Sequence, residues 1–400
     1  MIDRIIYNRK RLSDAPYTID TVFQPSSYGW QGDWEGRALL AFCCHYEIDG
    51  TVIPCMHEMV ETLRSHLNEK LYFGNVYDGV TVDEQQLSGH NWLMRGLIKY
   101  AELFDSTEAL DIAKSIFENL YFPSLDHFYH YPLAPRRIGE VAGTIVADGD
   151  DGWRLSSDVG CGLMSSDGVS EYYRFTHDER AKLWLDTVFG VFASADKYKS
   201  GFQTHSTLST TRALLGMYDI TKDERYLDIV KDTFRMYCDR AMTLTYENYN
   251  WFNKANTWTE PCAVVDSFIL ATELYKLTGE HRYLTLARRI WFNGLEFCQR
   301  SNGGAGPNTC VTPDQPILKV KMYEAPFCCT MRYAEGLLEY SKNKELFVWN
   351  SDAPEIIDEV GRHFVDDKLI VVFNGEKVPI FSCASFTEEE AKKLELLITY

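Results

Sequence analysis

The alternation of apolar and polar positions over the first three hundred residues follows a helical period. The segment 223–238, DERYLDIVKDTFRMYC, is a clear example of an amphipathic helix. Its apolar side chains fall mostly along one stripe: Tyr226, Leu227, Val230, Phe234, Met236 and Tyr237. Similar apolar helices end in an aromatic turn, and a short polar turn with Thr, Asp or Gly precedes the next helix. The pattern therefore predicts helical hairpins arranged in series.

The hairpin unit recurs along the chain. YDITKDERYL at 218–227 matches YKLTGEHRYL at 275–284, and weaker copies begin at Tyr173 and Tyr100. Repeats at intervals of roughly 45 to 60 residues are typical of a helical array, either an open solenoid or a closed toroid. Loops rich in Gly, Asp and aromatic residues favour the toroid, a closed (α/α) barrel with a site on one face. These loops lie at 26–36, 146–154, 248–258 and 301–308.

The pattern changes after about residue 345. Residues 366–382 contain a β-rich run, an Asn374-Gly375 turn and a second apolar run, which together predict a hairpin. The last residues, KLELLITY, predict another strand. We therefore expect a mainly α chain with two parts, an (α/α) barrel at 1–345 and a small β-containing segment at 346–400.

Composition and charge exclude several classes of protein. The net charge of -18 opposes binding to nucleic acid, and no apolar run is long enough, at about 18 residues, to predict a membrane span. The N-terminus lacks the pattern of a secretory signal, so we expect a cytoplasmic protein, as a monomer or a homo-oligomer. Aromatic residues make up 14% of the chain, which suits either a cleft that stacks on sugar rings or a helical core filled by large side chains.

The eleven cysteines point to candidate chemistry at two places. Glu260-Pro261-Cys262 precedes one apolar helix, and the adjacent pair Cys328-Cys329 precedes another. Unpaired N–H groups at a helix start lower the pKa of a thiol, and one carboxylate with three thiols would complete a tetrahedral zinc shell. Buried core thiols and a strained vicinal disulfide remain alternatives. The other adjacent pair, Cys43-Cys44, lies inside an apolar helix and is predicted to be core.

Three further residues are candidates for contact with a substrate. Glu247 lies in an aromatic loop 13 residues before Glu260, and an apolar wall would raise the pKa of its carboxyl to suit a general acid. The alternative is an ordinary solvated glutamate. His90 and His205 are each predicted to open a helix, where a ring could donate to a sugar hydroxyl or simply cap and pack.

Taken together, these motifs resemble the β-L-arabinofuranosidases of glycoside hydrolase family 127. The similarity runs from about Gly29 to Tyr340, and its most specific parts are Thr-Glu-Pro-Cys at 259–262 and the pair Cys328-Cys329. The chain differs from that family at Pro261, at 330–332 and in its shorter region after the barrel.

The resemblance implies an (α/α)6 barrel and a retaining glycoside hydrolase that releases L-arabinofuranose or a related sugar. It implies that zinc is bound by Glu260, Cys262, Cys328 and Cys329, that Cys328 is the nucleophile, and that Glu247 is the acid/base. His90, and more loosely His205, would contact the sugar. Two alternatives remain open: a metal-independent sugar epimerase or unsaturated uronyl hydrolase on the same barrel, and a non-catalytic carbohydrate-binding scaffold with a structural zinc.

Overall fold

The structure is a computed structural model that describes residues 2–23, 29–77, 80–136, 143–148, 152–252, 254–380 and 386–398. The chain divides into two compact units. One unit joins the two ends of the chain, Met1–Leu12 and Tyr237–Tyr400, and the other is the continuous stretch Ser13–Met236. The predicted boundary near residue 345 stays a prediction.

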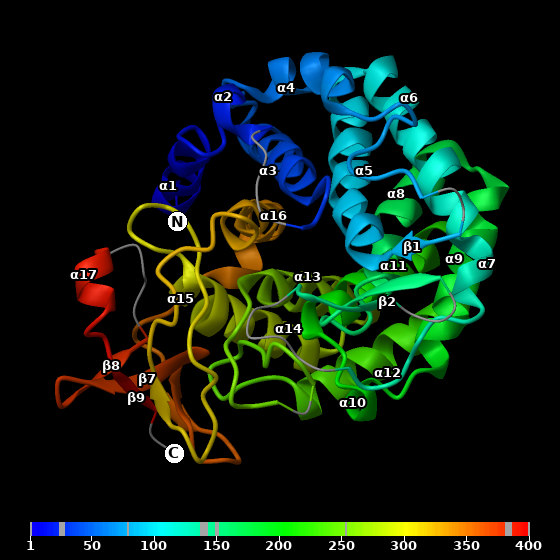
Figure 1. Ribbon diagram of the computed structural model, residues 1–400. Coiled ribbons are helices and arrows are strands. Elements are labelled where there is room, and N and C mark those ends of the chain that lie inside the picture. Colours follow the sequence, from blue (N-terminus) through cyan, green and yellow to red (C-terminus); the bar gives the residue numbers. More distant parts are fainter. Residues whose placement is uncertain are drawn as a thin grey trace. The chain divides into compact units, whose positions relative to one another are not determined.

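The unit Ser13–Met236 is built mainly from helices (Figure 1). Within it, α3 contacts α5, α5 contacts α6 and α8, and α8 contacts α9 and α11. The helices are α2 (Ile19–Val22), α3 (Asp33–Asp49), α4 (Met56–Leu63), α5 (Glu84–Phe104), α6 (Thr107–Ile116), α7 (Leu125–Phe128), α8 (Ser166–Thr176), α9 (Glu179–Ser194), α10 (Lys197–Ser200), α11 (Thr204–Thr221) and α12 (Glu224–Arg240), which crosses into the other unit.

This unit also holds a small sheet that the sequence did not predict. Its order is β1-β3-β2, with β1 parallel and β2 antiparallel to β3. The strands are β1 (Val82–Asp83), β2 (Ile145–Asp148) and β3 (Trp153–Ser156). They are two to four residues long, too short for an alternating pattern to stand out.

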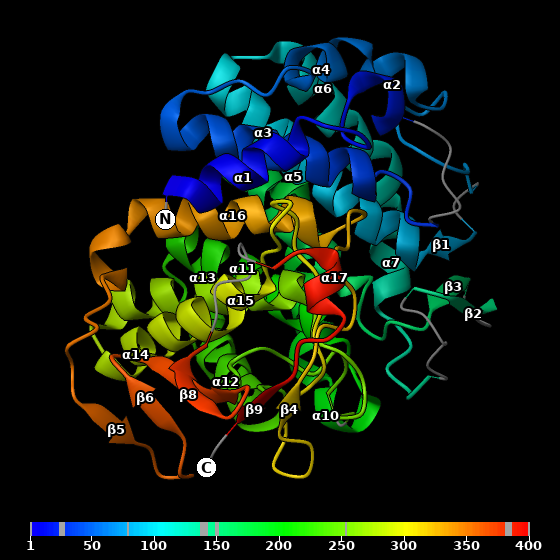
Figure 2. The same ribbon diagram turned by 90° about the vertical axis from the view of Figure 1, so that its left-hand side faces the viewer.

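The unit formed by the two chain ends contains the remaining helices. In it α13 contacts α14 and α16, and α1 contacts α16, as Figure 2 also shows. The helices are α1 (Ile2–Leu12), α13 (Pro261–Thr278), α14 (His281–Arg289), α15 (Glu296–Cys298), α16 (Cys329–Lys342) and α17 (Glu388–Ala391). A π-helical segment, Ile290–Leu295, joins α14 to α15.

The predicted C-terminal sheet is confirmed. All its pairings are antiparallel, in the order β4-β9-β7-β6-β5, and β8 pairs with β7. Asn374 and Gly375 both have positive φ, 51° and 84°, as a two-residue hairpin turn requires. The strands are β4 (Ile317–Leu318), β5 (Glu355–Ile357), β6 (His363–Val365), β7 (Lys368–Phe373), β8 (Glu376–Pro379) and β9 (Leu396–Ile398).

The repeated sequence motif is explained by one turn that recurs between paired helices. In three hairpins the first helix ends at a threonine whose hydroxyl donates to the carbonyl four residues earlier, at 2.7 Å: Thr176, Thr221 and Thr278. The same hydroxyl accepts the N–H two residues later, and the residue between them has a left-handed φ of 53°, 56° or 69°. The threonine thus closes one helix and orients the start of the next.

The fold class is therefore the predicted one, mainly helical with a small C-terminal antiparallel sheet. Among the residues that the structure describes, no helix has the combination of length and apolar character needed to cross a membrane.

Candidate functional site

The two cysteine-bearing motifs lie at helix starts, as predicted. Pro261 is the first residue of α13, where its missing N–H costs nothing, and Glu260 is the preceding N-cap residue. Cys329 is the first residue of α16, and Cys328 is its N-cap residue with φ -151° and ψ -62°. Because α13 contacts α16, both motifs belong to one packed pair of helices.

Three thiols from these helix starts come together. The sulfur atoms of Cys262, Cys328 and Cys329 all lie within 4.8 Å of one another, with 3.7 Å between Cys262 Sγ and Cys329 Sγ and 3.3 Å between Cys328 Sγ and Cys329 Sγ. None of the three forms a disulfide, so the vicinal disulfide is not present. Tetrahedral zinc with Zn–S bonds of about 2.3 Å separates its sulfurs by about 3.8 Å. The donor set and its spacing thus fit a metal ion such as zinc.

The fourth predicted ligand is close to part of this cluster. A carboxylate oxygen of Glu260 lies within 4.8 Å of Cys262 Sγ, although it does not belong to the group formed by all three thiols. The backbone N–H of Glu260 donates to Asn248 Oδ1 at 3.1 Å, which ties the N-cap to the loop before it.

The electrostatics of the thiol cluster differ from the expectation drawn from the sequence. Burial raises the pKa of the Cys329 thiol well above its usual value, and Cys262 and Glu260 raise it further because negative charges there repel one another. The lowering expected at a helix start is therefore not found for Cys329, because burial disfavours the charged thiolate. A bound cation would reverse the balance, since it favours thiolates.

Accessibility distinguishes the three thiols. Cys328 is 8% exposed, whereas Cys329 is 3% and Cys262 0% exposed. All three residues are buried, and Cys328 is the most exposed of them.

Glu247 is a buried carboxylate rather than a solvated one. Its side chain accepts hydrogen bonds from Thr245 Oγ1 at 3.0 Å, Thr259 Oγ1 at 2.9 Å and Asn308 Nδ2 at 2.8 Å. Burial raises its pKa from 4.5 to about 7, against the lowering effect of those hydrogen bonds. A carboxyl that titrates near neutral pH can both donate and accept a proton.

A buried arginine fixes the orientation of one donor to Glu247. Arg300, 1% exposed, donates to Asn308 Oδ1 at 2.9 Å, which leaves Asn308 Nδ2 facing Glu247. Arg300 is held in turn by backbone carbonyls, among them Tyr323 O at 2.7 Å. Sequence reasoning missed Arg300 and Asn308, and it did not connect Thr259 of the Thr-Glu-Pro-Cys motif with Glu247. The signal for Arg300 and Asn308 was the Gly-rich loop at 301–308, which they border.

The prediction that His90 opens a helix is wrong, because it lies well inside α5. Its ring is fully buried, with Nδ1 bonded to Gln86 O at 2.7 Å and Nε2 accepting from Phe73 N at 2.9 Å. Burial lowers its pKa to about 4, so the ring is neutral. These contacts occupy both ring nitrogens and hold the segment around Phe73 against α5.

His205 does open a helix, as the second residue of α11. It is 2% exposed and stacks on Trp92, with ring centroids 5.5 Å apart and 22° between planes. Both histidines belong to the unit Ser13–Met236, whereas Glu247 and the cysteine cluster belong to the other unit. Their roles as sugar contacts stay predictions.

Cysteines outside the cluster are also buried, among them Cys43, Cys44, Cys161 and Cys310. Cys43 and Cys44 are buried within α3, which confirms the prediction that they are core. Cys161 contacts Glu84, with Sγ 3.7 Å from Oε2, and Cys310 Sγ lies 3.6 Å from Asn248 O. Burial raises the pKa of Cys310 to about 12, so this thiol stays protonated. Cys383 lies outside the described residues.

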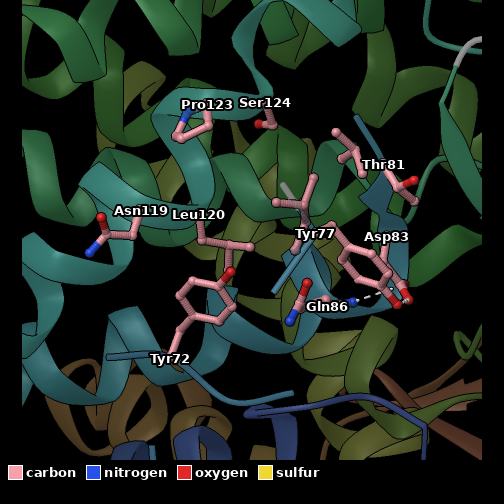
Figure 3. A pocket seen from close by; sticks show the side chains of 11 residues that line it. Tyr72, Tyr77, Thr81, Asp83, Gln86, Asn119, Leu120, Pro123 and Ser124 are labelled. Carbon is pink, nitrogen blue, oxygen red and sulfur yellow. Dashed lines mark hydrogen bonds between the residues drawn. The ribbon is translucent and has the colours of Figure 1, made fainter. Parts of the chain in front are cut away.

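A small pocket lies in the unit Ser13–Met236 (Figure 3). Asp83 caps α5 from its wall, accepting the N–H groups of Gln85 and Gln86 at 2.9 and 3.2 Å. The cavity of about 30 Å³ has room for roughly two water molecules. None of the predicted site residues is among the residues that line this pocket.

Solved structures share this fold at low sequence identity. No protein-family model and no curated protein sequence matches the chain. A GH127 β-arabinofuranosidase matches 93% of the chain with a TM-score of 0.55 and 12% identity. An unsaturated glucuronyl hydrolase specific for heparin matches 86%, with a TM-score of 0.59 and 12% identity, over 98% of its own length. Cellobiose 2-epimerase from Bacillus thermoamylovorans also matches 86%, with a TM-score of 0.55 and 13% identity, over all of its length.

These similarities place the chain among (α/α)-barrel folds. The chain spans 62% of the length of the β-arabinofuranosidase chain that it matches.

Proposed function

We propose that this chain is a retaining glycoside hydrolase, with Cys328 as the nucleophile and Glu247 as the acid/base. The observation that carries the proposal is the cluster of three buried thiols at the starts of α13 and α16. The fold similarity to a GH127 β-arabinofuranosidase and two other carbohydrate enzymes supports it. By the same resemblance, the proposed substrate is a glycan or glycoconjugate that carries L-arabinofuranose or a related sugar.

The metal in this proposal is zinc, held by Cys262, Cys328 and Cys329 with Glu260 as the fourth ligand. Bound zinc would keep the thiols deprotonated despite their burial. Cys262 and Cys329, the two more deeply buried thiols, serve only as ligands. A reducing compartment such as the cytoplasm would protect these thiols from oxidation.

The first step is a displacement at the anomeric carbon. The thiolate of Cys328 forms a C–S bond as the glycosidic C–O bond breaks, and Glu247 donates its proton to the departing oxygen. In the second step a water molecule gives its proton to Glu247, and its oxygen forms a C–O bond while the C–S bond breaks. Cys328 returns as the thiolate and Glu247 returns protonated. Two inversions leave the released sugar with its original anomeric configuration.

The proposal is tested by incubating the purified chain with aryl furanosides and pyranosides in both anomeric series, L-arabinofuranosides among them. Proton NMR of the earliest product should show a sugar with retained configuration. Hydrolysis with inversion would contradict the mechanism. Sugar that binds without turnover would favour a non-catalytic binding protein instead.

Metal content is the first expected result. Chain purified under reducing conditions with zinc present should hold about one zinc per chain, because four ligands suffice for a tetrahedral shell. Cys329→Ser should bind zinc at least about tenfold more weakly, since one of three thiolates is lost. Elemental analysis measures the zinc content, and competition with a chromogenic chelator measures the zinc affinity. Cys238→Ser, a change at a cysteine outside the cluster, should keep the full zinc content. Wild-type chain that takes up no zinc after resupply would contradict the site.

The pH dependence of activity is the second expected result. The pKa of Glu247 is raised to about 7, so the proton needed for the first step is present below that pH and lost above it. We expect kcat/KM to fall as the pH rises through about 7, and Glu247→Gln to lower kcat by about 10² to 10⁴-fold. Added azide should restore turnover of an activated aryl substrate in Glu247→Gln, because azide needs no general base. A profile that stays flat up to pH 9 would remove Glu247 from this role.

Burial of the Glu247 carboxyl also makes the free energy of unfolding depend on pH. Its folded-state pKa lies above its unfolded value, so its favourable contribution is complete below about pH 4.5 and is lost as the pH rises through about 7.

A second candidate function deserves a direct test, because the fold matches the unsaturated glucuronyl hydrolase with a TM-score of 0.59. In this case the chain would be a metal-independent uronyl hydrolase or a sugar epimerase. Activity on an unsaturated uronide or on cellobiose that survives both chelation and thiol alkylation would favour it. Loss of all activity under either treatment would favour the cysteine mechanism.

A further inference from the structure

The loop that carries Glu247 contains a residue with an unusual backbone conformation. Tyr246, the residue immediately before Glu247, has φ of +61°, which a bulky side chain rarely adopts. Such a conformation is energetically unfavourable and persists only where surrounding contacts hold it. The contacts of Tyr246 therefore show what holds the loop in place.

The phenol of Tyr246 is held by two arginines. Its hydroxyl accepts from Arg289 Nη1 at 2.8 Å and from Arg362 Nη2 at 2.9 Å, and the tyrosine is 3% exposed. The Arg362 guanidinium also lies 4.7 Å from the centre of the Tyr246 ring, a cation–π contact. Phe364 in β6 meets the same ring edge-on, at 6.1 Å between centroids.

The arginines connect this loop to the C-terminal sheet. Arg362 immediately precedes β6, and its Nη1 donates to the backbone carbonyl of Leu244 at 2.9 Å. Asp358, after β5, holds the Arg362 guanidinium at 2.8 Å. Arg289, at the end of α14, pairs at 3.1 Å with Asp367 in the turn between β6 and β7. The sheet thus contacts both the side chain of Tyr246 and the backbone two residues before it.

Short-range hydrogen bonds within the loop connect Tyr246 to the carboxylate of Glu247. The N–H of Tyr246 and that of Glu247 bond to the carbonyl and the hydroxyl of Thr243, both at 3.1 Å. Thr245, between Leu244 and Tyr246, donates to Glu247 Oε2 at 3.0 Å. Two separate sets of contacts therefore hold the carboxylate in place. One comes from the C-terminal sheet, and the other from the Arg300–Asn308 pair.

We infer that the C-terminal sheet positions Glu247, with Arg362, Arg289 and Tyr246 as positioning residues for proton transfer. The inference rests on the proposed role of Glu247 as the acid/base. It assigns the β-containing segment a part in the reaction, although none of these three residues need touch the substrate.

Arg362→Ala is the decisive variant. It removes the donor to Leu244 O and one of the two donors to Tyr246 Oη, so the loop should loosen and admit water around Glu247. Loss of a cation by itself raises the pKa of a carboxyl, whereas hydration lowers it toward 4.5. We expect Glu247 to bind its proton at least roughly tenfold more weakly in Arg362→Ala, and kcat to fall about tenfold with KM within twofold. Arg362→Lys keeps the positive charge and a single donor group, so its kcat and the proton affinity of its Glu247 should lie between those of the wild type and Arg362→Ala.

A matched control exists in the same unit. Arg282 donates to the hydroxyl of Tyr283 at 3.0 Å, lies 4.7 Å from the centre of its ring and pairs with Glu280 at 2.8 Å. Arg282→Ala therefore removes a hydrogen bond to a tyrosine hydroxyl, a cation–π contact and an ion pair, as Arg362→Ala does, but it leaves the loop that carries Glu247 untouched. It should leave kcat, KM and the pH profile unchanged.

The proton affinity of Glu247 is measured without any substrate, by infrared titration of the buried carboxyl band that disappears in Glu247→Gln. This measurement separates the positioning inference from the proposed function. Absence of turnover in the wild type would contradict the proposed function, while the titration would still test the positioning. An unchanged Glu247 titration in Arg362→Ala, with the fold intact by circular dichroism, would overturn the inference.

Discussion

Cys328→Ser is expected to fold like the wild type and to lose at least about a thousandfold in kcat. A serine hydroxyl is ionised far less readily than a thiol, and it is the ionised form that attacks. Cys328 also has the greatest exposure of the three clustered thiols, and it caps α16 without a side-chain hydrogen bond to the helix. The substitution therefore removes the nucleophile while leaving the start of the helix intact. Initial rates on the best aryl glycoside, with circular dichroism for folding, measure this.

Two controls separate the nucleophile from the ligand. Cys329→Ser should lose metal first and activity as a consequence, so excess zinc should restore part of its turnover. The same excess should restore none in Cys328→Ser. A glycosyl group trapped on the peptide that contains Cys328, found by mass spectrometry in Glu247→Gln, would identify the attacking sulfur directly. Turnover by Cys328→Ser at the wild-type rate would remove Cys328 from the mechanism.

The helical hairpins were predictable because each is determined locally. The turn after Thr176 depends on one hydroxyl that closes the helix and on Asp178, which accepts the N–H of Arg180 at 2.9 Å. All of these contacts span four residues or fewer. A motif such as Thr-x-Asp-x-Arg therefore carries its own structure wherever it occurs. The Asn374-Gly375 hairpin was predictable for the same reason.

The surroundings of Glu247 could not be predicted in the same way. Asn308 follows Glu247 by 61 positions, and Arg300 by more than 50, so neither leaves a local pattern. The sequence indicated a carboxylate whose pKa an apolar wall would raise. The structure instead surrounds it with two threonines and an amide, and burial still raises its pKa to about 7. His90 was misplaced because the helix begins at Glu84, six residues before His90 and so earlier than the Ser-Gly-His motif suggested.

The segment after the cysteine pair, where the chain differs from the family it resembles, has a structural explanation. Thr330 Oγ1 donates to Glu324 at 2.9 Å and accepts the N–H of Ala305 at 3.1 Å, which ties the start of α16 to the loop at 301–308. Arg332, 1% exposed, pairs with Asp266 of α13 and with Glu335 of its own helix. These residues join the two helices whose starts bring the thiols together.

Arg332→Met should accordingly be among the most destabilising single substitutions in the chain. It keeps the apolar stem but removes the guanidinium from two buried carboxylates, Asp266 at 0% and Glu335 at 6% exposure. Breaking a buried ion pair from one side costs about 3 to 5 kcal/mol, since the remaining charge stays in a poorly hydrated place. Urea denaturation of the zinc-loaded chain measures the free energy of unfolding.

The exposed pair Arg282–Glu280 provides the control for that loss. Arg282→Met removes a guanidinium whose side chain is 61% exposed, and should cost no more than about 1 kcal/mol. Adding Asp266→Asn to Arg332→Met should recover part of the lost stability, because one buried charge is then neutralised. Zinc affinity should follow the same order, since α13 must stay against α16 for Cys262 to meet Cys329. Equal stability of Arg332→Met and Arg282→Met would show that the buried pair does not hold the two helices together.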